Sequence, residues 1–117
     1  MKIRSGFVSN SSSSSFVLIT PKDYDYTKHI NFNPKFKDVY KDSFRPTEDK
    51  CLGQDVLVYT GYSDYGENSV TYSRELSKFV EENGHTDDET YELADEIYND
   101  FFKLFDKDMC FIHWEER

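Results

Sequence analysis

Chemistry in this sequence would have to come from histidines and carboxylates that lie close together along the chain. His85 is followed by Asp87 and Asp88, which are residue types that bind metals. The same segment has an explanation without a metal, because Thr86 and Glu89 have the spacing of a helix-capping box. His85 then lies in a turn between two helices and the acids cap the second one. We favour this interpretation because it accounts for every residue of the segment.

A second pair is formed by His113 and Glu115, which are two positions apart and would share one face of a strand. A pair like this can orient an imidazole ring or bind a metal. A metal site needs a third ligand, and the spacing supplies none. We therefore interpret the two residues as a surface pair.

Motifs for nucleophilic, metal or phosphate chemistry are absent from the sequence. GxSxG, HExxH and DxDxDG do not occur, and the five glycines form no pattern that would cradle a phosphate. We therefore predict a protein without catalytic residues, bound metal or cofactor. The contrary hypothesis, an enzyme, would require a bound metal.

Negative charge is concentrated in the second half of the chain. Residues 61–117 hold sixteen Asp and Glu against five Lys and Arg, whereas residues 1–60 hold seven against nine. Such an acidic half repels phosphate, which disfavours direct contact with DNA or RNA. A basic protein surface is the natural partner. The alternative is a solvated acidic face that only maintains solubility.

The densest acidic segment is a helix predicted for residues 87–106, where the carboxylates recur three and four positions apart and would form a row of charge. Neighbouring tyrosines would supply the aromatic anchors that are typical of interfaces, although one of them also fits the apolar face of the helix. The predicted contact residues are Glu92, Asp95, Glu96, Asp100, Tyr91, Tyr98, Glu81 and Glu82.

The fold that must position these residues is predicted to be a single α+β domain over residues 1–117. Phe16–Thr20 is apolar on both faces and reads as an internal strand that ends at Pro21. A second strand is predicted for 55–60, with 70–72 as a hairpin partner, and a buried terminal strand for 109–114. Residues 21–50 read as loops and short elements that aromatic side chains attach to the core.

Two helices in the second half complete the predicted architecture, about 73–83 and 87–106, packed against a small, mainly antiparallel sheet. Ser73 is a plausible N-cap for the first, and Gly84 suits the left-handed position that follows a helix. With 17% aromatic residues, a chain of 117 residues can bury a real core. The two cysteines, Cys51 and Cys110, are expected to be free thiols, and a disulfide between them remains open.

The N-terminal segment 5–15 contains the serine run Ser11–Ser15. It could be a tether, a modification site or a phosphate cradle, although it lacks the glycines that a cradle needs. We favour a structural role, in which Ser14 and Ser15 enter the strand and Ser11–Ser13 make local turn hydrogen bonds.

The stretch MKIRSGFVSNSSSSSFVL, over the first 18 residues, resembles an N-terminal signature of small, mostly uncharacterised phage and prophage-like bacterial proteins. The resemblance implies an origin and no activity. With the acidic half, it leads us to expect an accessory protein that inhibits or modulates a host nucleic-acid-handling or defence protein. The alternative is a structural or assembly component of a phage particle, with the N-terminal segment donated to a neighbouring subunit. No secretion signal or membrane span is expected, so the predicted location is the host cytoplasm.

Overall fold

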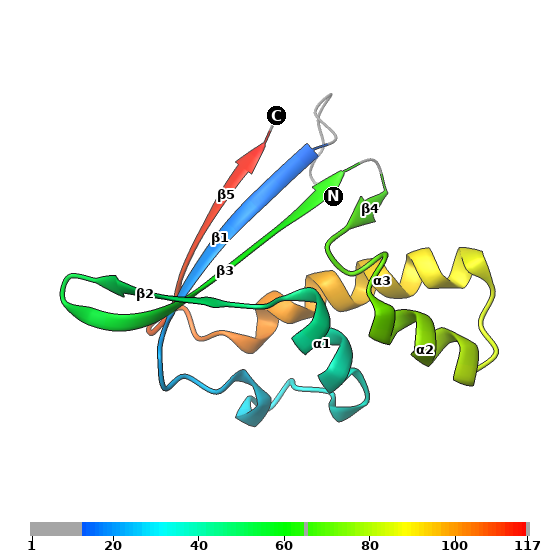
Figure 1. The fold of residues 1–117 in the computed structure, drawn as a ribbon, viewed down its shortest axis with the longest axis horizontal. Helices are drawn as coiled ribbons and strands as arrows, with labels where there is room; N and C mark the ends of the chain where they lie inside the picture. The colour runs from blue at the N-terminus through cyan, green and yellow to red at the C-terminus, as the bar shows by residue number, and fades with distance from the viewer. Residues whose placement is uncertain (1–12, 65, 117) are drawn as a thin grey trace.

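The computed structural model describes residues 13–64 and 66–116 and shows an α+β fold, as the sequence predicts. Its sheet has the order β2-β3-β1-β5, with every neighbouring pair antiparallel and the short β4 paired to the end of β3. The strands are β1 (Ser13–Pro21), β2 (Thr47–Cys51), β3 (Gln54–Asp64), β4 (Glu67–Asn68) and β5 (Phe111–Glu116). Figure 1 shows the helices gathered on one side of this sheet.

The three α-helices are α1 (Lys37–Ser43), α2 (Arg74–Glu82) and α3 (Asp87–Phe101). The N-terminal caps of α2 and α3 follow local sequence. The Ser73 hydroxyl accepts a hydrogen bond from the backbone N–H of Leu76, and Thr86 forms the complete capping box with Glu89. Gly84 has a φ of 69° after the end of α2, as predicted for a residue that terminates a helix.

β1 is the internal strand that its apolar faces predict, and it ends at Pro21. Phe16 and Leu18 point into the core and are each 2% exposed, whereas Val17 points to the opposite face and is 36% exposed. The strand begins at Ser13, so Ser13 is part of the ladder and not of a turn as predicted. Its hydroxyl donates to Asp64 Oδ1 over 2.8 Å. Ser11 and Ser12 lie outside the described residues.

The core is built mainly of aromatic rings, several of which come from the irregular region 21–50. Phe101 on α3 is fully buried, and its ring stacks on that of Phe44 with 3.9 Å between the centroids. Aromatic side chains of this region thus contact α3 in the core. The region contains α1, β2 and two short 3-10 helices, Tyr26–Lys28 and Pro34–Phe36. Its buried hydrophobic residues are Tyr26, Phe36, Val39, Tyr40 and Phe44.

Two predicted boundaries in the acidic half are wrong. The α-helix ends at Phe101, not at 106, and continues as one 3-10 turn, Phe102–Leu104. After it Phe105 is extended and its ring stacks on Tyr24, with 5.5 Å between the centroids. The predicted hairpin partner 70–72 is also wrong, because β3 pairs with Glu67–Asn68 and Val70 is fully buried in the core.

The terminal strand exists but is not buried as predicted. β5 begins at Phe111 and lies at the edge of the described sheet, paired with β1. Because no further described strand covers it, Phe111 is 60% and Trp114 43% exposed. The two cysteines are free thiols, Cys51 exposed and Cys110 half-buried. No helix in the described part of the chain is long and apolar enough to cross a membrane.

Candidate functional site

The acidic surface is carried by α3, because the opposite face of this helix fills the core. Ala94, Ile97 and Phe101 follow helical spacing and are fully buried. Residues that lie between these positions must point outward. Glu92 and Asp95 are accordingly exposed, so the backbone of α3 holds its carboxylates in the row that the sequence predicts.

The structure places the predicted contact residues unequally. Those exposed on α3 and at the end of α2 are Glu81, Glu82, Tyr91, Glu92, Asp95 and Glu96. The short connection 83–86 joins the two helices, so Glu81 and Glu82 precede a turn that leads directly into the first acids of α3. Asp100 is partly buried and accepts a hydrogen bond from Lys103 Nζ over 3.2 Å, which neutralises part of its charge.

Tyr98 must be removed from the predicted contact residues. It lies one turn after Ala94 on the core face of α3, and only 4% of its surface is exposed. Burial raises the pKa of its hydroxyl well above the ordinary value. The hydroxyl has no hydrogen-bond partner among the described residues, so this tyrosine serves packing and not contact with a partner.

Cations of the first half do not neutralise the acidic row. Among the described residues, the lysines and arginine of the first sixty positions pair only with acids of the same half, as Lys22–Glu48, Arg45–Asp42 and Lys50–Asp55. The one described ion pair between the halves joins His29 to Asp106, beyond the end of α3. The charge asymmetry of the sequence is therefore retained on the folded surface.

The linear charge density of α3 is close to that of one nucleic-acid strand. The helix carries seven Asp and Glu in 15 residues. At a rise of about 1.5 Å per residue the helix is about 22 Å long, which gives about one carboxylate per 3 Å. Duplex DNA has one phosphate per about 3.4 Å along each strand. Both strands of the duplex together carry about one charge per 1.7 Å, so this helix alone is sparser than a duplex.

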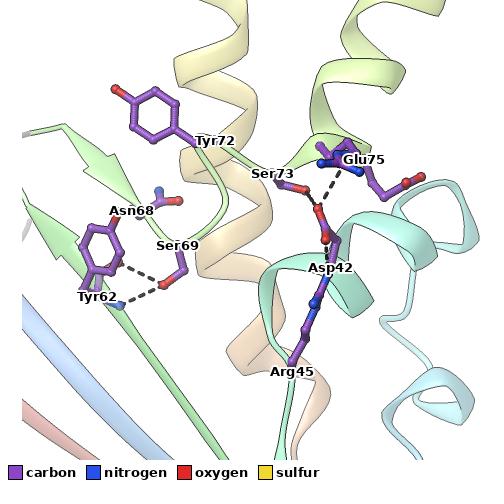
Figure 2. A pocket seen from close by; sticks show the side chains of 9 residues that line it. Asp42, Arg45, Tyr62, Asn68, Ser69, Tyr72, Ser73 and Glu75 are labelled. Atoms are coloured by element: carbon purple, nitrogen blue, oxygen red, sulfur yellow. Dashed lines mark hydrogen bonds and ion pairs between the residues drawn. The ribbon is translucent and has the colours of Figure 1, made fainter.

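A second feature of the surface is a cleft where α1, β3 and the start of α2 meet, as Figure 2 shows. This cleft of about 680 Å³ is lined by Asp42, Arg45, Tyr62, Asn68, Ser69, Tyr72, Ser73, Arg74 and Glu75. The side chains of Tyr62 and Tyr72 are 45% and 65% exposed. No motif or spacing in the sequence predicts a site at these residues.

Asp42 is the organising residue of the cleft. Its Oδ2 accepts hydrogen bonds from Ser73 Oγ over 2.7 Å and from the backbone N–H of Glu75 over 3.3 Å, and its Oδ1 accepts one from Arg45 over 2.7 Å. These donors, the Ser73 hydroxyl first, lower the pKa of Asp42 to about 2. The carboxylate thus caps the N-terminus of α2 from a different helix. Ser73 alone had a sequence signal, since Asp42 lies 31 residues away.

The hydroxyl and carboxylate that lie together in the cleft, those of Ser73 and Asp42, are both engaged in capping α2. Tyr72 donates to Glu67 Oε1 over 2.8 Å. The histidines lie elsewhere: His85 Nδ1 is 3.5 Å from Glu89, and His113 Nε2 is 3.8 Å from Glu115. Among the described residues no group of three or more His, Cys, Asp and Glu could hold a metal ion. The cleft therefore stabilises the junction of α1 and α2.

Stability below pH 4 tests this role of Asp42. Because its pKa is lower in the folded chain than the ordinary 3.8, its contribution to stability is complete above that value and is lost as the pH falls toward 2. We expect the loss to be about 2 kcal/mol, at about 1.4 kcal/mol per pKa unit. Asp42→Asn should reduce this part of the pH dependence, measured by urea unfolding at pH 6 and pH 2.5. Asp38→Asn, an exposed position in the same helix, should keep it; equal pH dependence of both variants would refute the assignment.

Comparison of the chain with protein-family models, with curated proteins and with solved structures gives no match. The fold and the exposed residues of α3 define the chain as an α+β domain with an exposed acidic helix.

Proposed function

We propose that this chain is a non-catalytic accessory protein of the phage type, which binds a basic surface of a host nucleic-acid-handling or defence protein and inhibits or modulates it. The contact surface, which we call the acidic face, consists of Glu81, Glu82, Tyr91, Glu92, Asp95, Glu96 and the exposed part of Asp100. The observation that carries the proposal is that these carboxylates are exposed at the end of α2 and along α3, whose opposite faces are buried in the core.

The partner class follows from charge and spacing. A surface that binds nucleic acid presents Lys and Arg at intervals set by phosphates, and the carboxylates of α3 have a similar interval. Tyr91, which is 44% exposed beside this row, adds an aromatic contact of the kind that often contributes strongly to interfaces. Electrostatic attraction over this area would make association fast and sensitive to salt.

Charge reversal on α3 tests the proposal. Glu92→Lys, Asp95→Lys and Glu96→Lys together should weaken capture of a basic partner at least about tenfold, because each removes an attraction and adds a repulsion. The measurement is a pull-down from host lysate, followed by binding of the captured protein at increasing salt and by competition with short duplex DNA. Duplex DNA should release the captured protein.

The matched control makes the same change in net charge elsewhere. Asp23→Lys, Asp38→Lys and Asp49→Lys are exposed replacements in the first half of the chain. The amount of partner captured by this variant should stay within about twofold of the wild-type amount. Charges farther apart than about 10 Å are largely screened at ordinary salt. Equal weakening by both triple variants would show that net charge, and not the acidic face, determines binding. Unchanged capture by the α3 variant would refute the proposal.

A second candidate function is a structural or assembly component of a phage particle. The observation that favours it is the exposed apolar edge of the sheet at β5, which lies outside the acidic face. An open edge strand is a site where another chain can add a strand.

A further inference from the structure

The two edge strands of the described sheet differ in how well they are protected against pairing with another chain. β2, at one edge, has the sequence TEDKC, is exposed throughout and carries three charged residues, which discourages pairing with another chain. β5, at the other edge, has the sequence FIHWEE and lacks this protection over its first four residues. Phe111, Ile112 and Trp114 are 60%, 37% and 43% exposed.

The helices leave one face of the sheet uncovered (Figure 1), and apolar residues of β1 and β5 belong to that face. The register places Ile19 opposite Phe111 and Val17 opposite His113, so Val17 and Phe111 belong to that face. Val17 is 36% and Met109, which precedes the strand, 55% exposed. Ile112 and Trp114 lie opposite Leu18 and Phe16, so they belong to the other face of the sheet, where they border the core. We call Val17, Met109, Phe111, Ile112 and Trp114 the β5 edge. Exposed apolar side chains thus lie on both faces of this unpaired strand, and an open strand of this kind is a site where another chain can pair.

The N-terminal segment of this chain has the chemistry that the β5 edge would accept. Within residues 1–12, the six residues Ile3–Val8 include Ile3, Phe7 and Val8, which favour strands, and their number equals the length of β5. Lys2 and Arg4 give the segment a positive charge, and β5 carries the exposed carboxylate of Glu115. Length, apolar content and charge therefore complement the edge.

The entry point of the segment favours a second copy as acceptor. Residue 12 joins β1 at Ser13, which pairs with Asp64 on β3, while Ser14 pairs with Glu116 at the end of β5. A segment that continued the direction of β1 would leave the sheet at this end. To reach the β5 edge of its own chain it would have to reverse and pass the end of β5, whereas strands that are consecutive in sequence more often lie next to each other in a sheet.

We propose that residues 1–12 of one copy add a strand to the β5 edge of a second copy, so that the chain self-associates by exchange of N-terminal segments. The proposal gives the assembly function a specific contact and is independent of the acidic face. Main-chain hydrogen bonds to β5 would supply affinity, and Phe7 and Val8 would cover the exposed apolar side chains. The serine run then links the exchanged segment to β1.

The test is sedimentation equilibrium of the full chain with variants on each side of the contact. The wild-type chain should form a reversible dimer or larger assembly at micromolar concentration. Phe7→Asp in the segment and Phe111→Lys at the edge should each raise the dissociation constant about tenfold or more. Leu52→Lys is the matched control, because it places the same charge on a 99% exposed apolar residue next to the other edge strand and should leave the constant unchanged.

Mixing the two defective variants separates exchange between copies from other contacts. Phe7→Asp chains retain the edge and Phe111→Lys chains retain the segment, so a mixture should form pairs that neither variant forms alone. Two outcomes would overturn the proposal: a wild-type chain that stays monomeric, or association that neither substitution weakens. If the chain is monomeric and Phe7→Asp speeds amide exchange in β5, the segment pairs with its own chain. The α3 charge reversal should leave self-association in place, so failure here and failure of the acidic face are distinguishable.

Discussion

Phe101→Ala is expected to lower the free energy of unfolding by about 3–5 kcal/mol, the range found for removal of a buried aromatic ring. Phe101 is fully buried, and its ring stacks on Phe44 with 3.9 Å between centroids and 4° between planes. It also contacts Tyr59 and Phe105, at 5.7 and 5.0 Å between centroids. The cavity would lie where α3, the irregular region and the sheet meet. A loss of this size is a large part of the total stability of a small domain, about 5–15 kcal/mol.

Urea unfolding, followed by circular dichroism, measures the effect. Ile30→Ala is the control, because Ile30 is 93% exposed and its truncation should change the free energy by less than about 0.5 kcal/mol. Phe101→Leu keeps most of the volume and should cost less than Phe101→Ala. A loss below about 1 kcal/mol for Phe101→Ala would show that the stacked rings are not the centre of the core.

Gly61→Val is expected to destabilise the fold by about 3 kcal/mol, although valine normally suits a strand better than glycine. Gly61 lies opposite Phe16 in the β1–β3 ladder, and a Cβ at this position would be 2.5 Å from Phe16 Cε2 and 2.5 Å from Ser69 Oγ. The ring of Phe16 cannot move aside freely, because it packs on Phe102 with 4.8 Å between centroids. The backbone of Gly61 is not left-handed like that of Gly53, so the cost is steric.

A double-mutant cycle with Phe16→Leu checks this cause. The smaller side chain removes the clash with the ring, so Gly61→Val should cost less in the Phe16→Leu background than in the wild type, by 1 kcal/mol or more on the scale of about 0.5–3 kcal/mol seen for contacting residues. Additive effects of the two substitutions would contradict a clash between these side chains. Thr60→Val, at the neighbouring exposed position of β3, is the control for strand propensity.

Local sequence was sufficient to predict much of the secondary structure in the second half of the chain. The capping box of Thr86 and Glu89, the N-cap Ser73 and the left-handed Gly84 are all present as predicted. Each of these features depends on residues within about four positions, so it is encoded in the order of side chains. The periodic burial on α3 likewise follows from helical spacing, and it made the acidic row predictable.

The predictions that were wrong or missing concern residues whose surroundings are set by distant parts of the chain. Tyr98 fitted both the acidic row and the apolar face, and the packing of Phe16 against its ring, at 6.1 Å between centroids, places it inside. The apolar composition of 109–114 predicted burial, but burial of a strand depends on whether another strand lies beside it. Asp42 gave no signal, because the helix that it caps begins 32 residues later.

The sequence by itself determined the α+β class, the two capped helices, the internal strand at Phe16–Thr20 and the segregation of charge between the halves. These properties follow from local periodicity and composition, which are read directly from the order of residues and do not depend on contacts between distant parts of the chain. The tertiary structure decided which acids remain free of cations, which tyrosine is lost to the core and which sheet edge stays open. Those outcomes depend on contacts between residues far apart in the chain, and such contacts exist only once the helices have packed on the sheet.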